Sequence, residues 1–467
     1  MQIFVRDRSF YKKLVTIALP ITLQSLITIG VNMMDNIMLG RLGEIAMSAA
    51  SQANQVFSLF QIFCMGMGMG ASVLISRYYG MQDFISLKKS VTIMYRLLLI
   101  LGSLFTIAAI VAPGFLMSLY TNEEAVIAEG IRYYRWSIPC FLLQGLSLTT
   151  TIVLRSIGKV HIPLYTSIGA FFINVGANYI FIFGKFGAPE MGVAGAALGT
   201  LISRTFEFAI ICGYFLLKEK DVGYKVRDLF GKCGDILGDY IRISIPVLIS
   251  DGLLGLGNTA VAMVYGRLGS SFVSANAIAA VTMQLTTVVI QGMSNASAII
   301  TGHTLGEGDA KKAQAQGYTF LALGALFGAL AAVIIVIISG PVIGFYKITE
   351  ETRNIAFQLM DAVAIIVFFQ AMNSILTKGV LRGGGDTKFL MVADILFLWI
   401  VSIPLGCLAG FVWHLPAFWI YFCIRIDQVI KAVWCIWRLK SGKWIKKIDS
   451  HVLDAEKMVE EVAVETE

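Results

Sequence analysis

One acidic residue interrupts the first long apolar stretch of this sequence. Asp35 lies near the end of the stretch 13–39 and is flanked by Met33 and Met38. A charged side chain is costly inside a hydrocarbon layer, so an acid at such a position usually serves an ion, a proton or a polar ligand. We therefore expect Asp35 to take part directly in function.

Two further apolar stretches carry polar residues at a similar depth. Asn174 and Asn178 are four residues apart and share one helix face, as do Ala196 and Thr200. At about 1.5 Å per residue, these four residues and Asp35 lie within roughly 15 Å of the same membrane surface. The five residues are the predicted cation site. The alternative, that the asparagines only form hydrogen bonds between helices, remains open.

The chemistry of this site allows two cations. Carboxylate, amide and hydroxyl oxygens are the ligands that hard cations prefer, so Na⁺ could bind at Asp35, Asn174, Asn178 and Thr200. Burial disfavours the charged form of a carboxyl group, so Asp35 could carry a proton instead. The sequence leaves the choice between H⁺ and Na⁺ open.

A second acid lies in the other half of the chain. Asp251 follows Pro246 by five residues and falls near the middle of its apolar stretch. It could face a cationic ligand, or it could be paired structurally beside a water-filled cleft. The predicted ligand-contacting residues are Asp251, Gln284, Gln291, Asn373, Met33 and Met38.

Other charged residues in apolar stretches have simpler explanations. Arg204 and Glu207 are three residues apart, and we expect a buried structural ion pair. Asp361 and Asp394 lie near the ends of their stretches and are expected at the membrane interface. Arg425, Asp427 and Lys431 are expected to form a local charge network.

The composition shows what kind of protein positions these residues. Of the 467 residues, 14% are charged and 57% are hydrophobic. Soluble proteins have about 25% charged residues, so a soluble domain and a disordered chain are both excluded. The net charge of +7 comes from short basic clusters between apolar stretches. This pattern is typical of cytoplasmic loops rather than of a nucleic-acid surface.

Other chemistries lack their motifs. The seven cysteines are scattered and the four histidines lie far apart, so neither a disulfide framework nor a histidine metal site is predicted. A Walker A motif and a recognisable Ser-His-Asp order are missing from the sequence. We therefore expect neither an enzyme nor a bound cofactor.

The apolar stretches are long enough for membrane-spanning helices, which need about 20 apolar residues each. Twelve candidates are present: 13–39, 47–76, 91–119, 131–154, 161–183, 191–217, 239–264, 271–302, 317–345, 355–381, 388–412 and 416–438. Lysine and arginine gather before the first span and after the second, fourth, sixth, eighth and twelfth. The positive-inside rule then places both termini in the cytoplasm.

The chain also repeats itself. With a shift of 226 residues, Pro20 matches Pro246, and the string Gly-Arg-Leu-Gly at 40–43 matches the same string at 266–269. With a shift of 227, Leu-Arg at 154–155 matches Leu-Arg at 381–382. Each repeat holds six spans, so both halves have the same orientation and the natural binding site is between them.

These observations predict an all-α membrane protein. Twelve transmembrane helices would form two pseudo-symmetric six-helix bundles around a central cavity. The predicted parts are an N-lobe at 1–217, a cytoplasmic linker at 218–238, a C-lobe at 239–440 and an acidic cytoplasmic tail at 441–467.

Three motifs resemble the multidrug and toxic compound extrusion (MATE) family of transporters. The first runs from Pro20 through Asp35 to the string Leu-Gly-Arg-Leu-Gly. The second is Asn-x-x-x-Asn-Tyr-Ile-Phe-Ile-Phe-Gly at 174–184, and the third is Leu-Arg-Gly-Gly-Gly-Asp-Thr at 381–387. The resemblance covers nearly the whole chain. Many family members have an acid in the tenth span where this sequence has Asn373, so a second cation site in the C-lobe is in doubt.

The resemblance implies a secondary active multidrug antiporter in the plasma or inner membrane. It would export cationic amphipathic compounds in exchange for H⁺ or Na⁺, with its N-lobe cation site at the residues around Asp35. A monomer is expected, and its partners would be small cationic drugs and the lipid bilayer. The alternative is a flippase for lipid-linked or polysaccharide substrates, which would need several basic residues in its cavity to hold a pyrophosphate.

Overall fold

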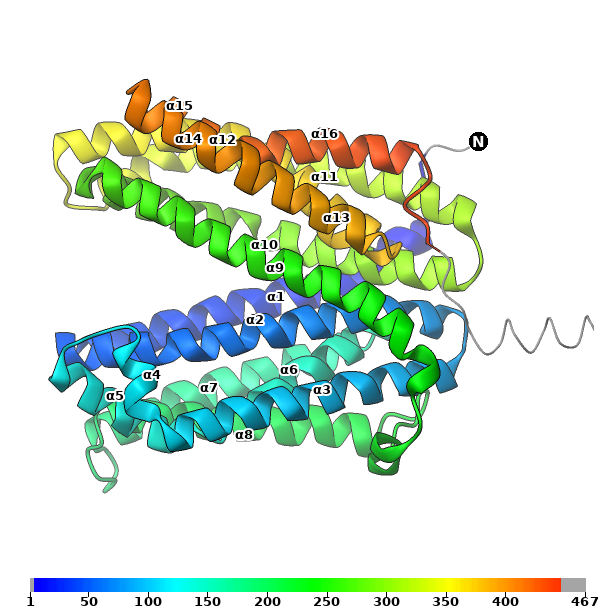
Figure 1. The fold of residues 1–467 in the computed structure, drawn as a ribbon, viewed down its shortest axis with the longest axis horizontal. Coiled ribbons are helices and arrows are strands. Elements are labelled where there is room, and N and C mark those ends of the chain that lie inside the picture. Colours follow the sequence, from blue (N-terminus) through cyan, green and yellow to red (C-terminus); the bar gives the residue numbers. More distant parts are fainter. Residues whose placement is uncertain (1–3, 447–467) are drawn as a thin grey trace, which may run out of the picture. The chain divides into compact units, whose positions relative to one another are not determined.

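The computed structural model describes residues 4–446 of the chain. Within this range all regular elements are helices and no strand occurs (Figure 1). The all-α prediction is therefore confirmed. From residue 447 onward, the predicted acidic tail lies outside the described residues.

The chain forms two compact units, which we describe separately. The N-terminal unit contains residues 23–79 and 83–242. Its helices are the second part of α1 (Arg8–Gly40), α2 (Glu44–Gly80), α3 (Phe84–Val111), α4 (Pro113–Ser118), α5 (Glu124–Ser137), α6 (Cys140–Ser156), α7 (His161–Phe183), α8 (Val193–Leu217), the 3₁₀ helix η1 (Val226–Phe230) and the start of α9 (Gly234–Leu268).

The C-terminal unit contains, among the described residues, 4–22, 80–82 and 243–446. Its helices are the first part of α1, most of α9, α10 (Ser270–Gly306), α11 (Ala310–Gly344), α12 (Glu350–Ser374), α13 (Thr387–Asp394), α14 (Ile403–Cys407), α15 (Ala417–Ile424) and α16 (Ile426–Lys440). Three π-helical segments continue or join these helices: η2 (Ile375–Leu381), η3 (Ile395–Ser402) and η4 (Leu408–Val412).

Helix α1 contributes to both units. Pro20 lies inside it, and the division between the units follows two residues later. The first part of α1 packs on α11 of the C-terminal unit, where the rings of Phe10 and Phe320 are 5.4 Å apart. The backbone nitrogen of Val5 donates a hydrogen bond of 3.0 Å to Thr319 Oγ1. These contacts explain why residues 4–22 group with the C-terminal unit.

The segment predicted as a linker is anchored on α3 of the N-terminal unit. The Arg96 side chain donates hydrogen bonds of 2.8 and 2.7 Å to the backbone oxygens of Leu229 and Gly231. The hydroxyl oxygens of Thr92 and Tyr224 lie 3.0 Å apart. This part of 218–238 is therefore packed against the helix bundle.

The predicted spans correspond to the helices with three refinements, the first of which is the division of the predicted span 91–119 between α3 and α4 at Ala112. Within residues 4–446, ten helices are long and apolar enough to cross a membrane, or eleven if α5 and α6 count as one span with a bend of 57°. The bend falls at Ile138 and Pro139, inside the predicted span 131–154. The predicted twelfth span, 416–438, is divided between α15 and α16, which meet at Arg425.

The sequence repeat reappears as repeated local structure. Asp83 and Asp309, 226 residues apart, cap the N-termini of α3 and α11 by accepting hydrogen bonds from the backbone nitrogens of Ser86 and Lys312. Gly43 and Gly269 follow α1 and α9 with φ of 101° and 119°, a backbone region in which glycine is favoured. The two halves thus use the same caps and turns.

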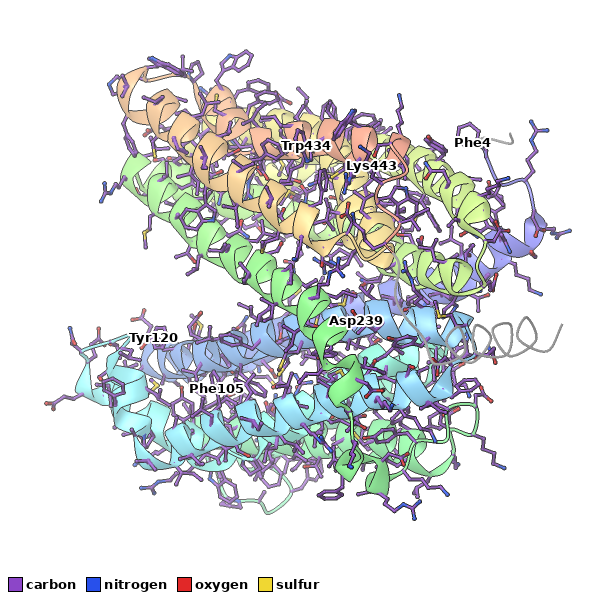
Figure 2. All side chains as sticks on the ribbon, turned by 45° about the vertical axis from the view of Figure 1, so that its right-hand side comes forward. Phe4, Phe105, Tyr120, Asp239, Trp434 and Lys443 are labelled. Carbon is purple, nitrogen blue, oxygen red and sulfur yellow. The ribbon has the colours of Figure 1, made fainter. Side chains whose placement is uncertain are left out.

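The last helix of the C-terminal unit is fixed by aromatic and charged contacts. The rings of Trp434 and Phe389 stack with centroids 5.6 Å apart, and Figure 2 shows Trp434 on the strongly amphipathic helix α16. Arg438 lies 4.5 Å from the ring centre of Phe389 and pairs with Asp386 at 2.6 Å. These contacts hold α16 to the start of α13.

Candidate functional site

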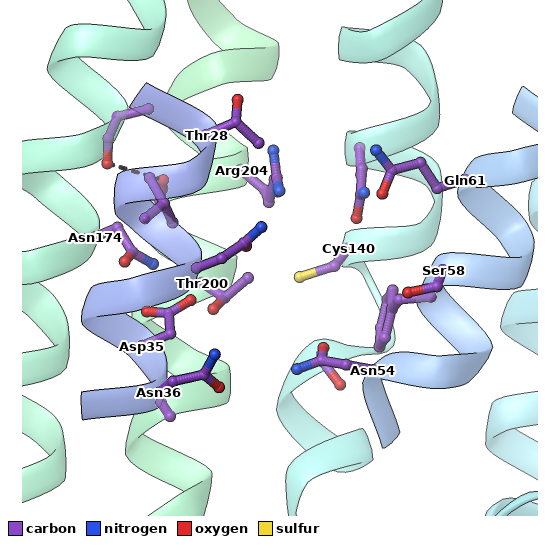
Figure 3. Close-up of a pocket in the computed structure, with 18 of the residues that line it drawn as sticks. Thr28, Asp35, Asn36, Asn54, Ser58, Gln61, Cys140, Asn174, Thr200 and Arg204 are labelled. Atoms are coloured by element: carbon purple, nitrogen blue, oxygen red, sulfur yellow. Dashed lines mark hydrogen bonds between the residues drawn. The ribbon is translucent and has the colours of Figure 1, made fainter. Parts of the chain in front are cut away.

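A polar cavity of about 410 Å³ lies within the N-terminal unit. Its walls come from α1, α2, α5, α6, α7 and α8. In Figure 3, Asp35, Asn174 and Thr200 lie on one side of the cavity, and Asn54 and Gln61 lie on the other. A polar cavity between membrane-spanning helices is a suitable place for a charged or polar ligand.

Asp35 is half-buried in the wall of this cavity and bonds to a neutral partner. The Nδ2 atom of Asn178 donates a hydrogen bond of 2.6 Å to Asp35 Oδ1 and one of 3.2 Å to Asn174 Oδ1. The side chains of Asn174 and Asn178 are almost fully buried. The structure therefore brings Asp35, Asn174 and Asn178 into one hydrogen-bonded group.

One amide oxygen of this group is left without a partner. Asn178 Oδ1 is buried and accepts no hydrogen bond from the residues that the structure describes. A buried acceptor without a donor costs about 1–3 kcal/mol. The site thus contains an oxygen that a bound cation could satisfy.

Small residues on α8 allow this group to form. A side chain at Gly195 would meet the backbone of Phe181, and one at Gly199 would meet the Oδ1 atom of Asn178. Close approach of helix backbones through small residues is typical of membrane helices. It brings Ala196 and Thr200, which line the cavity, next to the two asparagines on α7.

The opposite wall was not predicted from the sequence. It contains polar residues of α2, together with the hydroxyl of Tyr133, which donates a hydrogen bond of 3.2 Å to Asn54. The α2 residues are Ser51, Asn54, Gln55, Ser58 and Gln61. Their spacing of three or four residues marks one face of a helix, and this periodicity could have identified them.

Arg204 and Glu207 form the ion pair that the sequence predicted. Arg204 Nη1 lies 2.6 Å from Glu207 Oε2. Both side chains also line the cavity, which the interpretation as a buried structural pair did not anticipate. They belong to the same site as Asp35.

The remaining predicted site residues lie elsewhere. Met38 is buried, whereas Met33, Gln284 and Gln291 are exposed. Asp251 Oδ1 lies 3.2 Å from Arg382 Nη2. The structure therefore provides Asp251 with a basic partner, which corresponds to the structural alternative that the sequence left open.

Asn373 belongs to a buried network of the C-terminal unit. Its Nδ2 atom donates a hydrogen bond of 2.8 Å to Gln428, which in turn donates one of 2.7 Å to Asp427. Lys431 lies 2.9 Å from Asp427 and 3.1 Å from Asp394. Asp427 and Lys431 are paired as predicted, whereas the third predicted member, Arg425, donates a hydrogen bond of 3.2 Å to Asn258.

Asp394, expected at the membrane interface, is a buried member of this network. Its side chain is buried, pairs with Lys431 and accepts a hydrogen bond from Ser250. The expectation arose because Asp394 lies near the end of its predicted span. In the structure, Ser250 of α9 and Lys431 of α16 contact the carboxylate from two sides. A basic partner 37 residues later in the chain makes this burial possible.

The described part of the chain offers no conventional metal site. Among residues 4–446, no group of three or more histidine, cysteine, aspartate or glutamate side chains is placed to hold a metal ion. The donors around Asp35 are of another kind, with one carboxylate among neutral amide and hydroxyl oxygens. This set suits a weakly held monovalent cation better than a permanent metal.

Comparisons with known proteins agree with this architecture. The residue pattern of the family described as MatE matches residues 20–180 and 246–408, once in each half of the chain. A probable multidrug resistance protein NorM of Idiomarina loihiensis is 26% identical over 440 residues, which cover 90% of this chain and 92% of that protein. The multidrug resistance protein MdtK of Yersinia pseudotuberculosis is 23% identical over 455 residues, with 93% and 96% covered.

Solved structures share the fold. A multidrug resistance MATE family transporter of the MOP superfamily, described in its outward-facing conformation, has a TM-score of 0.82 and 20% identity, and the match covers 93% of this chain and 97% of that chain. A crystal structure of MATE in the straight conformation also has a TM-score of 0.82, with 92% and 96% covered. The predicted architecture of twelve helices in two bundles is confirmed.

The repeated helical fold and its intramembrane polar cavity define a multi-pass membrane transporter. Because the family pattern covers more than half of its length, the chain belongs to the MatE family. The resemblance that the sequence motifs carried is thereby confirmed.

Proposed function

We propose that this protein is a secondary active multidrug antiporter that exports cationic amphipathic compounds in exchange for H⁺ or Na⁺. The observation that carries the proposal is the pairing of Asp35 with a neutral amide. An acid inside a membrane protein that has no basic partner at hydrogen-bond distance retains a strong attraction for any cation that reaches it. The names of the NorM and MdtK relatives support drug efflux as the task.

In the proposed mechanism, the NH₂ group of Asn178 occupies the position that the coupling ion would take. This group lies between oxygens of Asp35 and Asn174, where a small cation would be attracted. If Na⁺ enters, rotation of the amide would turn the unpaired Oδ1 atom toward the ion. The ion would then bind oxygens of Asp35, Asn174, Asn178 and Thr200, in keeping with the preference of hard cations for oxygen.

A proton would use the same site differently. Protonation of Asp35 removes the negative charge, so the carboxyl group no longer attracts an organic cation. Either H⁺ or Na⁺ therefore competes with the drug for one carboxylate. Such competition is sufficient for exchange, provided that the two ligands favour different conformations of the transporter.

The flippase alternative has weaker support. A pyrophosphate requires several basic groups, and of the described residues that line the cavity only Arg204 is basic. This arginine is already paired with Glu207. The charge of the cavity therefore favours cations over phosphorylated lipids.

The placement of the protein follows from the same proposal. We place it as a monomer in the plasma or inner membrane, with both termini in the cytoplasm. The halves 1–217 and 239–440 would act as lobes, joined by the segment 218–238. The basic residues around the predicted cytoplasmic loops support this orientation.

The proposal is tested by transport in vesicles. Purified protein in liposomes should move ethidium against its gradient when a Na⁺ or H⁺ gradient is imposed, and collapse of the driving gradient alone should stop it. Efflux that continues after both gradients are collapsed, or that requires ATP, would contradict the proposal. Movement of a fluorescent lipid but not of ethidium would favour the flippase.

A further inference from the structure

The charge of the cavity is set by three residues. Among the described residues that line it, Asp35, Arg204 and Glu207 are charged and all others are neutral. Two carboxylates and one guanidinium give a formal charge of −1. Inside a membrane protein this charge interacts strongly with a bound ligand, because little water screens the interaction.

The ion pair that contributes two of these charges is accessible from the cavity. The Arg204 side chain is 33% exposed and that of Glu207 is 15% exposed. A guanidinium has five N–H donors, and among the residues that the structure describes Glu207 is the hydrogen-bond partner of Arg204. A purely structural pair in an apolar interior would be sealed from the cavity, whereas this pair faces the space that a ligand would occupy.

Arg204 and Asp35 line the same cavity. Asp35 lies five residues before the end of α1, and Arg204 lies eleven residues after the start of α8. At about 1.5 Å per residue, the two differ in depth by roughly 9 Å. Glu207 lies three residues further along α8, and all three charged side chains line the cavity that a ligand at Asp35 would occupy.

We propose that the Arg204–Glu207 pair determines specificity by holding the cavity at a charge of −1, so that the preferred ligand carries one net positive charge. Glu207 contributes attraction for cations, and Arg204 offsets it and disfavours a second positive charge. Over the width of such a cavity, one unit charge changes the binding of a cation by about tenfold at an effective dielectric constant of about 20. The inference rests on the proposed function, because it assumes that the cavity binds the transported cation.

The test compares two flat cations of nearly equal size. Methylphenylpyridinium carries one positive charge and methyl viologen carries two. The ratio of their initial uptake rates is measured in vesicles containing the wild-type protein, R204Q, E207Q, the double variant R204Q/E207Q and R204K. The formal charges of the cavity are then −1, −2, 0, −1 and −1.

We expect the wild-type protein to prefer the monovalent probe. R204Q should shift the ratio about tenfold toward methyl viologen, and E207Q should shift it about tenfold the other way. The double variant lacks the ion pair but has the original charge, so its ratio should return to that of the wild type. R204K should keep the wild-type ratio.

A merely structural ion pair predicts a different pattern. Its loss would slow both probes together and would leave their ratio unchanged, and the double variant would be as impaired as either single variant. That result, or a double variant whose ratio stays shifted, would overturn the inference. If R204Q fails to fold, E207Q and the double variant still decide the question. A wild-type protein that moves ethidium but neither probe would overturn this inference alone, whereas a protein that moves none of the three cations would refute the proposed function itself.

Discussion

Arg382 and Asp251 form an ion pair with 3.2 Å between Nη2 and Oδ1, both within the C-terminal unit. The residue that corresponds to Arg382 in the first repeat is Arg155. It donates a hydrogen bond to the neutral side chain of Gln24 in the N-terminal unit. Asp251 therefore meets a ligand only in competition with a basic residue. Asp35 differs, because the side chain that donates a hydrogen bond to it is the amide of Asn178.

Replacing Asp251 by Asn should lower the stability of the protein but leave its ion-driven transport intact. The change leaves the buried guanidinium of Arg382 without its carboxylate, and we expect a loss of about 1–3 kcal/mol of stability. Ion-driven efflux should remain, because the coupling carboxylate is elsewhere. Thermal unfolding in detergent and vesicle transport measure the two effects, with Asp361→Asn as a control for an exposed acid. Loss of coupling with unchanged stability would instead indicate a second ion site.

Replacing Gly199 by Ala should weaken the binding of the coupling ion. The added methyl group would overlap Asn178 Oδ1 and push the amide away from Asp35. We expect the ion concentration for half-maximal transport to rise about tenfold, corresponding to the loss of a hydrogen bond to a charged group. Gly213→Ala, on the same helix, is the matched control, because an added methyl group there would meet no atom of the described residues within 4 Å. Equal behaviour of the two variants would refute the role of Asn178.

Replacing Lys431 by Met should strongly destabilise the protein. The side chain is 2% exposed and lies between Asp394 and Asp427, so its loss removes the ion-pair partner of two buried carboxylates. Breaking a buried ion pair from one side costs about 3–5 kcal/mol. The apparent melting temperature in detergent should fall accordingly, whereas the exposed Lys440→Met should not change it. A melting temperature close to that of the wild type would show that the network is not needed for stability.

The loop contact of Lys159 should be insensitive to pH in the physiological range. Burial lowers the Lys159 pKa, but hydrogen bonds and charges of Asp221 and Glu219 outweigh it and raise the pKa above its ordinary value. A raised lysine pKa gives stabilisation that is complete below the unfolded-state pKa and is lost only as pH rises through the folded-state pKa. Both values lie well above neutral pH.

Lys159→Met should therefore lower the melting temperature by the same amount at about pH 6 and about pH 9, because lysine is ionised at both values. The salt bridges of 3.0 Å to Glu219 and 2.7 Å to Asp221 are lost in each case. Lys220→Met, at an exposed position nearby, is the control. A penalty that is much smaller at the higher pH would contradict this assignment.

Much of the fold could be predicted because its signals are local. Apolar runs, basic clusters and the repeat identified the spans and the two halves, and helical spacing brought Asn174 and Asn178 to one face. The ends of the apolar runs did not indicate where helices bend or break. The bend at Pro139 and the break at Arg425 lie inside the predicted spans 131–154 and 416–438 rather than at their ends.

Contacts between helices were harder to predict, because each depends on how a helix is rotated about its axis. The burial of Asp394 was not predicted, since its partner Lys431 comes from another helix. Arg204 and Glu207 were correctly paired, since that contact is local, but their exposure to the cavity depends on α1, α2 and α6. The polar face of α2 is visible in the sequence as a helical spacing of Ser51, Asn54, Gln55, Ser58 and Gln61.

The most direct test of the central claim replaces Asp35 by Asn and measures ethidium transport in vesicles with an imposed Na⁺ or H⁺ gradient, with Asp361→Asn as the control. The account predicts a folded protein in which neither gradient drives ethidium efflux, because the carboxylate shared by drug and ion is gone. Gradient-driven efflux at the wild-type rate in the Asp35→Asn protein would contradict it.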